Sequence, residues 1–225
     1  MGVTSGLPKT GFLSGASDDL KHLLESLKTE ITLARGEVLF EQGDEGDALF
    51  AIISGALEFS ILSEDGRKLS LDMMRPGALF GEIALFDPGE RTATAMAIEP
   101  SRVWRVKNAD VLARIRKDPD LAVDMIKLAG QRMRWMNRQL QEQVFLPLPS
   151  RLARKILHLA PVRGGEPTSL TLSQTELAEY VGATREAVSK TLAGWKRIGV
   201  IDASRGGLVV LDRAALDALA EPGLI

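Results

Sequence analysis

The sequence contains no cysteine and only two histidines, and each scarcity removes a class of function. Without thiols the chain can form no disulfide, no thiolate nucleophile and no thiolate metal site. His22 and His158 lie far apart in the sequence, so we expect neither a histidine metal centre nor a prosthetic group.

Long apolar runs are also missing. No stretch approaches transmembrane length, and the N-terminus lacks the basic, apolar and small-residue pattern of a signal peptide. Hydrophobic residues make up 45% and charged residues 26% of the 225, which is average for globular proteins. We expect a cytoplasmic protein without a membrane partner, large enough for one large domain or two modest ones.

The net charge of −2 conceals a small asymmetry along the chain. Residues 148–225 carry 10 Lys and Arg against 8 Asp and Glu, whereas residues 1–147 carry 18 against 22. A slightly basic C-terminal part is compatible with a polyanionic partner.

Hydrophobic periodicity changes after residue 27. Leucines at helical spacing behind Ser17 predict a helix over residues 17–27, with Ser17 as its N-cap. Asp65-Gly66, between two alternating runs, predicts a two-residue hairpin turn. Short apolar or alternating runs, many separated by glycine, follow at 31–33, 38–40, 49–53, 57–62, 69–73, 93–98 and 103–106. Many short strands at regular spacing predict a β-sandwich or barrel.

The stretch 80–94 combines residues suited to a phosphorylated ligand. Gly81 lets backbone N–H groups approach a ligand at the start of a short helix, where an anion is favoured. Arg91 can hold a phosphate with two hydrogen bonds, and Thr92 adds a donor. Glu82 would repel a phosphate, but it can accept a hydrogen bond from a ribose hydroxyl. The stretch predicts a pocket for a small phosphorylated nucleoside; the alternative is an ordinary loop in which Arg91 pairs with a nearby acid.

A long helix is predicted next. Residues 109–117 predict a short helix, and Pro119 suits the first turn of a longer one that runs to about Phe145. Its apolar residues follow a nearly heptad spacing: Ile126, Ala129, Met133, Met136, Leu140 and Val144. Such a seam favours a parallel helix pair and a twofold dimer. The alternative is a helix packed only against its own domain.

The segment 145–150, Phe-Leu-Pro-Leu-Pro-Ser, ends this helix. Two prolines at this spacing predict an extended hinge. We therefore expect a domain over residues 1–118, a connecting helix over 119–146 and a second domain over 147–225.

Beyond the hinge, the pattern predicts a helix, an exposed loop, a β-wing and a terminal helix at residues 151–159, 161–167, 199–211 and 213–221. Ser173-Gln174-Thr175-Glu176 is a capping box that opens a helix ending near Gly182. A second helix begins at Thr184, and the spacing of small, apolar and glycine residues from 177 to 188 is typical of a helix-turn-helix.

The second of these helices offers base-reading side chains in its first turns, as a recognition helix must. Arg185 can bond a guanine, Glu186 can accept from a cytosine amino group, and Lys190 can reach another guanine. Val188 is expected to point inward. With phosphate contacts included, the candidate DNA-binding residues are Ser173, Gln174, Thr184, Arg185, Glu186, Ser189, Lys190 and Arg205.

Phe-Asp-Pro-Gly-Glu-Arg-Thr at 86–92 closely resembles the phosphate-binding cassette of the cyclic-AMP receptor protein / fumarate-nitrate regulator (Crp/Fnr) family of transcriptional regulators. Arg-Glu-Ala-Val-Ser-Lys at 185–190 resembles the family's recognition signature. The lack of cysteine separates the chain from the family's iron–sulfur sensors. The resemblance implies an α+β fold: an N-terminal β-roll (cyclic-nucleotide-binding jelly-roll) domain, a long dimerisation helix and a C-terminal winged helix-turn-helix domain.

The resemblance also implies a ligand site, formed by Phe80, Gly81, Glu82, Ile83, Ala84, Arg91, Thr92, Ala93, Met136 and Asn137. Met136 stands where the family usually has threonine, and a thioether cannot donate a hydrogen bond to the base. Cyclic AMP is the first expected effector, with cyclic GMP or another nucleotide left open.

The expected function is a homodimeric transcriptional regulator that is gated by a cyclic nucleotide and binds a palindromic GTGA-type operator. The resemblance also places the loop 161–167 where family members contact RNA polymerase, a candidate further partner. An enzyme of the cupin type is not expected, because its metal needs histidines and the strand region has none. The alternative that remains is a regulator of the same fold that needs no cyclic nucleotide or senses a different effector, which Met136 favours.

Overall fold

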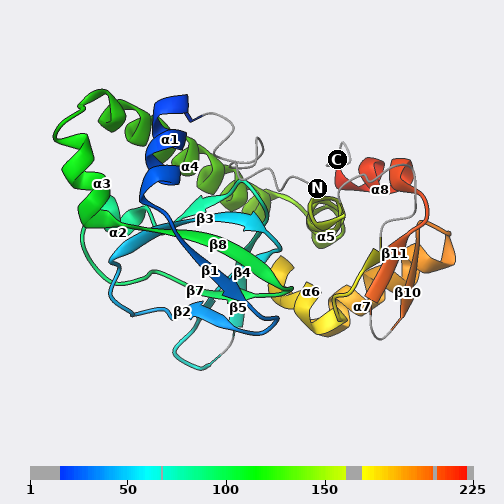
Figure 1. Ribbon diagram of the computed structural model, residues 1–225. Helices are drawn as coiled ribbons and strands as arrows, with labels where there is room; N and C mark the ends of the chain where they lie inside the picture. The colour runs from blue at the N-terminus through cyan, green and yellow to red at the C-terminus, as the bar shows by residue number, and fades with distance from the viewer. Residues whose placement is uncertain (1–15, 67, 161–168, 205–206, 222–225) are drawn as a thin grey trace, which may run out of the picture. The chain divides into compact units, whose positions relative to one another are not determined.

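The computed structural model describes residues 16–66, 68–160, 169–204 and 207–221 (Figure 1). The chain divides into two compact units, one of Met1–Ile61 with Leu71–Met136 and the other of Leu62–Ser70 with Asn137–Ile225. Among the described residues, no helix is both long enough and apolar enough to cross a membrane.

Short antiparallel strands and helices build the first part of the chain. Its elements are α1 (Asp18–Leu27), β1 (Thr29–Leu33), β2 (Val38–Phe40), β3 (Ala48–Ser54), β4 (Leu57–Leu62), β5 (Lys68–Met74), β6 (Leu79–Phe80), α2 (Ile83–Phe86), β7 (Thr94–Ala97), β8 (Ser101–Lys107), α3 (Asn108–Ile115) and α4 (Asp120–Phe145). One sheet has the order β1-β8-β3-β6 and the other β2-β7-β4-β5.

The two sheets pack face to face, which confirms the predicted sandwich. Phe50 and Ile52 of β3, Phe59 of β4, Phe80 of β6 and Ala95 of β7 belong to one buried cluster. Alternate residues of a strand point to opposite faces, so the same strands also present apolar side chains to the outside of the sandwich.

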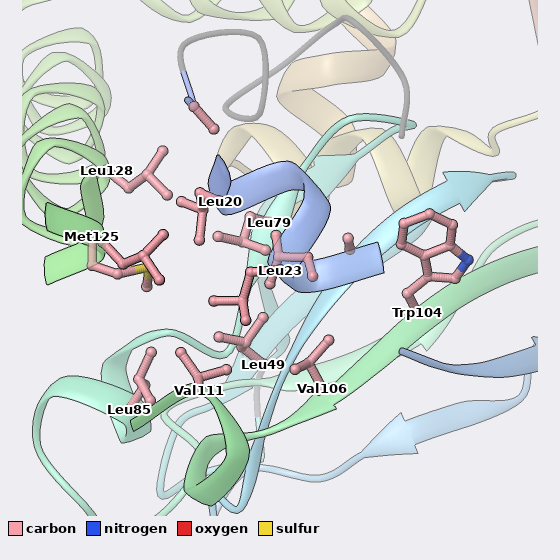
Figure 2. Packing of buried hydrophobic residues seen from close by; sticks show 14 residues of the cluster. Leu20, Leu23, Leu49, Leu79, Leu85, Trp104, Val106, Val111, Met125 and Leu128 are labelled. Carbon is pink, nitrogen blue, oxygen red and sulfur yellow. The ribbon is translucent and has the colours of Figure 1, made fainter. Parts of the chain in front are cut away.

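Helices cover that outer face of the first sheet. Leu20 and Leu23 of α1 and Met125 of α4 converge on Leu49 of β3 and Leu79 of β6 (Figure 2). This second layer explains why β3 is buried on both faces and reads as a continuous apolar run.

The start of α1 is as predicted. The Ser17 hydroxyl accepts a hydrogen bond from Leu20 N over 3.1 Å, which satisfies one of the free N–H groups of the first turn. The helix ends at Leu27, where the strand-like pattern begins.

The prediction of a two-residue turn at Asp65-Gly66 is wrong. The flanking strands end at Leu62 and resume at Lys68, so the connection is longer. Gly66 N donates to Ser63 O over 2.8 Å, and Gly66 has a φ of 78°. The turn is therefore formed by Ser63 to Gly66, and glycine occupies its last position because L-residues avoid positive φ.

Helices and a small sheet make up the second part of the chain. Its elements are α5 (Leu148–Leu159), β9 (Ser169–Leu170), α6 (Gln174–Val181), α7 (Arg185–Arg197), β10 (Ile201–Ser204), β11 (Gly207–Val210) and α8 (Arg213–Ala220). The sheet order is β10-β11-β9, and β9 is a strand that the sequence pattern did not reveal.

The break after α4 is narrower than the predicted hinge. Helix α5 already begins at Leu148, and Pro149 lies in its first turn, where a missing N–H costs nothing. Arg154 Nη1 donates to Glu142 Oε1 over 2.8 Å, and Lys155 Nζ donates to Gln139 Oε1 over 2.8 Å. These contacts hold the last turns of α4 against α5, so the expectation of an extended hinge over residues 145–150 is wrong.

Candidate ligand pocket and nucleic-acid interface

The site begins with Gly81, which follows β6 in a conformation that only glycine adopts easily. Its φ is 78°, and an added Cβ would lie 2.8 Å from Arg91 Nη1 and 3.0 Å from Ala48 O. Both the backbone and the surrounding atoms therefore require the absence of a side chain here.

Arg91 is a buried cation with an incomplete set of hydrogen bonds. Its Nη2 donates to Ala48 O over 2.8 Å and its Nη1 to Gly81 O over 3.4 Å. The guanidinium lies over the rings of Phe40 and Phe50, 4.5 and 5.3 Å from their centroids. Within the described part of the chain, its buried Nε has no hydrogen-bond partner. An anion at this place would satisfy that donor and the charge together.

The charges around Arg91 compensate it only partly. Burial lowers the pKa of Arg91 from its ordinary value, and Asp47 is the largest influence in the opposite direction. Asp47 Oδ1 lies 3.9 Å from Arg91 Nη2, while its Oδ2 makes a short ion pair with Arg105. Since Asp47 is shared with a second cation, the pocket retains an attraction for an anion.

Glu82 is the buried acid of the site. It is 6% exposed, and its Oε1 lies 3.6 Å from Arg132 Nε on α4. Arg132 in turn lies over the ring of Trp135, 4.7 Å from the centroid. Glu82 is thus held by a cation on the long helix, and its carboxylate remains an acceptor for hydroxyl groups.

These residues surround a cavity of about 150 Å³. The lining includes all the predicted ligand residues except Asn137: Phe80, Gly81, Glu82, Ile83, Ala84, Arg91, Thr92, Ala93 and Met136. Asn137 is exposed and is not one of the lining residues.

Sequence reasoning missed part of the lining, namely Phe40, Phe59, Leu71, Asp72, Glu90, Arg132 and Trp135. For two of them the sequence contains a clue to their position. Arg132 lies four residues before Met136, hence on the same helix face. Asp72 occupies an inward position of β5, where an acid is unusual.

The long helix has one buried and one exposed apolar face. Leu121, Met125 and Leu128 are buried in the first unit, but Ile126 and Leu140 of the heptad seam are 68% and 63% exposed. The remaining seam residues are the exposed Met133, Met136 and Val144 and the half-buried Ala129. The alternative of packing only within its own domain therefore leaves this face uncovered.

The helix-turn-helix forms as predicted. Ser173 and Glu176 make a complete capping box at α6, and Gly182 ends that helix with φ 65°. Thr184 caps α7 by accepting from Ala187 N over 3.2 Å. Val188 is fully buried, as expected for the inward face.

The predicted DNA-contacting residues differ in their surroundings. Arg185, Glu186 and Lys190 are exposed at the start of α7, together with Thr184, whereas Ser189 and Gln174 are half-buried. The Ser173 hydroxyl accepts from Glu176 N, so it serves as a cap. Arg205 and the loop 161–167 lie outside the described residues.

Comparison with known proteins agrees with both parts. The family description "Cyclic nucleotide-binding domain" matches residues 30–118, and "Crp-like helix-turn-helix domain" matches residues 150–219. The CRP-like cAMP-activated global transcriptional regulator of Mycobacterium tuberculosis is 32% identical over 202 residues, covering 85% of this chain and 90% of that protein. The cyclic AMP receptor protein of Thermus thermophilus is 33% identical over 186 residues, covering 83% and 85%.

A solved structure shares the whole architecture. The crystal structure of a Crp/Fnr-family transcriptional regulator from Thermus thermophilus superposes with a TM-score of 0.73 at 27% identity, covering 87% of this chain and 100% of that one. The chain therefore belongs to the Crp/Fnr family of transcriptional regulators and combines a cyclic-nucleotide-binding domain with a Crp-like DNA-binding domain.

Proposed function

We propose that this regulator binds DNA as a twofold dimer whose affinity for its operator is set by a cyclic nucleotide. The observation that carries the proposal is the buried guanidinium of Arg91, whose Nε has no partner among the described residues and which stands beside the side-chain-free Gly81. A cyclic phosphate supplies a negative charge opposite Arg91 and oxygens that accept from its N–H groups. It fits beside Gly81, where there is no room for a Cβ.

The other pocket residues divide between the parts of such a ligand. The backbone of Gly81 to Ala84 and the Thr92 hydroxyl donate to the phosphate, and Glu82 accepts from the ribose 2′-hydroxyl. Met136 packs against the base. Asn137 does not line the cavity in the single chain, so its proposed hydrogen bond to the base requires a movement of α4 or of the ligand. Relatives are named for cyclic AMP, so cyclic AMP and cyclic GMP are the two candidate effectors to be compared.

The dimer is formed through the exposed seam of α4. Ile126, Met133, Leu140 and Val144 recur at the spacing of a two-stranded coiled coil, and their exposure in the single chain supports a second copy as the partner. A twofold axis then repeats α7, which matches a palindromic operator.

Arg185, Glu186 and Lys190 read a GTGA-type half-site in the major groove, with Lys190 relaxing specificity at its base. Gln174, Thr184, Ser189 and Arg205 contact the phosphates. RNA polymerase is the expected further partner of a bound dimer, through residues 161–167.

The coupling is a difference in affinity. The nucleotide shifts the protein toward DNA binding only if it binds that state more tightly, and a tenfold shift requires about 1.4 kcal/mol.

Isothermal titration with cyclic AMP and cyclic GMP tests the proposal, on the wild type, Arg91→Ala and the matched control Arg102→Ala. Arg102 is a half-exposed arginine that pairs with Glu30 on the surface of β8, away from the pocket. We expect binding heat in the wild type and the control and its loss in Arg91→Ala.

Absence of heat with both nucleotides in the wild type would overturn the cyclic-nucleotide hypothesis. It would favour the second candidate, a regulator of the same architecture with a different effector or none. Met136 supports this candidate, because it lines the cavity and its side chain cannot donate a hydrogen bond to a base. DNA binding by the dimer would stand in that case.

A further inference from the structure

We infer that Asp72 reads the base of the bound nucleotide and makes the pocket prefer guanine to adenine. The inference rests on the proposed cyclic-nucleotide function and deepens it. It starts from a carboxylate that the pocket contains and that the phosphate and ribose do not use.

Strand β5 has an inverted pattern around this residue. Leu69 and Leu71 are 38% and 39% exposed, whereas Ser70 and Asp72 are 3% and 8% exposed. A strand with one face on a core normally points its apolar residues inward. Here an acid takes the inward position and lines the cavity, so that end of the pocket carries a polar group.

The sheet places Asp72 at the end of the pocket opposite the phosphate site. The strands lie in the order β7-β4-β5, and Arg91 to Ala93 immediately precede β7. Neighbouring strands are about 4.8 Å apart, so β5 lies about 10 Å from β7, with Phe59 of β4 between them. A cyclic nucleotide anchored by its phosphate at Arg91 extends its base across β4 toward β5.

The walls at that end suit a flat ring. Leu71, Trp135 and Met136 line the cavity together with Asp72. Aromatic and thioether groups pack on the faces of a base without selecting it. Selection therefore depends on the polar groups at the edge of the base.

The charged group at this end of the cavity, the Asp72 carboxylate, accepts hydrogen bonds. The Asp72 carboxylate has two oxygens with several lone pairs, of which Oδ1 accepts from Met73 N over 2.9 Å. The Met136 sulfur is at most a weak acceptor. A base that pairs with Asp72 must therefore supply the donors.

Guanine supplies two donors side by side, the ring N1–H and the N2 amino group, which match a carboxylate as a charge-assisted pair. Adenine presents its single amino group next to the N1 lone pair, which would face a carboxylate oxygen. Pairing with the Asp72 carboxylate thus favours guanine.

The test is isothermal titration of the purified protein with the 3′,5′-cyclic phosphates of guanosine, inosine and adenosine, on the wild type and Asp72→Asn. In the wild type we expect the dissociation constant of cyclic GMP to be lower than that of cyclic AMP by a factor of about ten or more. This factor corresponds to the gain of one charge-assisted hydrogen bond. Cyclic IMP, which keeps N1–H but lacks the amino group, should lie between them.

Asp72→Asn should abolish or reverse the order, because an amide offers one acceptor and one donor and so matches the adenine edge. Asp87→Asn is the matched control, since Asp87 is an exposed acid after α2 that does not line the cavity, and it should keep the wild-type order. Thermal unfolding checks that each variant is folded, and Asp72→Ser is a second variant that also removes the carboxylate.

The outcomes separate the two proposals. Heat with an unchanged order in Asp72→Asn and Asp72→Ser, or tighter binding of cyclic AMP by the wild type, overturns the role of Asp72 and leaves the cyclic-nucleotide pocket standing. No heat with any nucleotide in the wild type overturns both.

Discussion

Arg132 and Glu82 form an ion pair of 3.6 Å that ties the long helix α4 to the loop after β6. The Arg132 side chain is 20% exposed and that of Glu82 is 8% exposed. The ligand pocket therefore has α4 as one wall, and that wall is held by the acid that we assign to the ribose.

Replacing Arg132 by Gln should lower the free energy of unfolding by about 1–2 kcal/mol. This is less than for a fully buried pair, because Arg132 retains some solvent. Urea unfolding measures it, and Arg134→Gln, an exposed change on the same helix, should have little effect. In the double variant with Glu82→Gln, part of the loss should return; equal losses with and without Glu82 would show that the two residues are not coupled.

Gly81→Ala should abolish nucleotide binding and lower stability by about 1–3 kcal/mol, since it combines a positive φ with contacts of 2.8 and 3.0 Å. Gly36→Ala is the matched control, because Gly36 has φ 84° but open space around an added Cβ. It should show only the backbone cost of about 1 kcal/mol and keep the binding heat. Titration and thermal unfolding measure both, and equal binding by the two variants would contradict the crowded geometry assigned to Gly81.

Leu140→Glu should dissociate the proposed dimer, because it places a charge on the exposed seam of α4 in both copies. The loss of two buried leucines weakens the dimer about a hundredfold or more. Sedimentation equilibrium measures the change. Gln141→Glu, on the same turn but off the seam, should remain dimeric; an unchanged oligomeric state in Leu140→Glu would place the interface elsewhere.

The lowered pKa of Asp124 leads us to expect that the free energy of unfolding falls at acidic pH. A hydrogen bond from the Ser17 hydroxyl, with a smaller contribution from Lys127, holds the pKa of Asp124 below its ordinary value of 3.8. A folded-state pKa below the unfolded one stabilises the protein above pH 3.8, and this contribution disappears as the pH falls through the folded-state pKa.

Asp124→Asn should therefore be less stable than the wild type at pH about 7, and the difference should shrink toward pH about 2.5. Urea unfolding at several pH values measures this. Asp217→Asn, the same substitution at an exposed acid on α8, is measured in parallel as the control for loss of a carboxylate. A difference that stays constant with pH would mean that the carboxylate's charge is not what stabilises α1 and α4.

Local signals in the sequence predicted the elements well. The caps at Ser17, Ser173 and Thr184 and the periodicity of α4 depend on residues close together in the chain, so they could be read without the structure. The turn after β4 and the early start of α5 at Leu148 were missed, because the same Asp-Gly and Pro residues suit more than one local geometry.

The pocket was predictable only in part. Gly81, Glu82 and Arg91 form a contiguous motif, whereas Asp72 and Arg132 reach the cavity through the order of the strands and the packing of α4. Their proximity to the motif depends on contacts between segments distant in sequence, which composition and spacing do not encode.

Met136 lines the cavity and also lies on the exposed seam of α4, where it is 52% exposed. Under the proposed function, a mutation at this position would change effector affinity and self-association together, so selection on either property would constrain the other. Asp72 lies on β5 and not on the seam of α4, so a mutation there does not alter the proposed dimer contact. Divergence of effector specificity among descendants of this chain would therefore proceed more freely on the sheet side of the pocket than on the helix side.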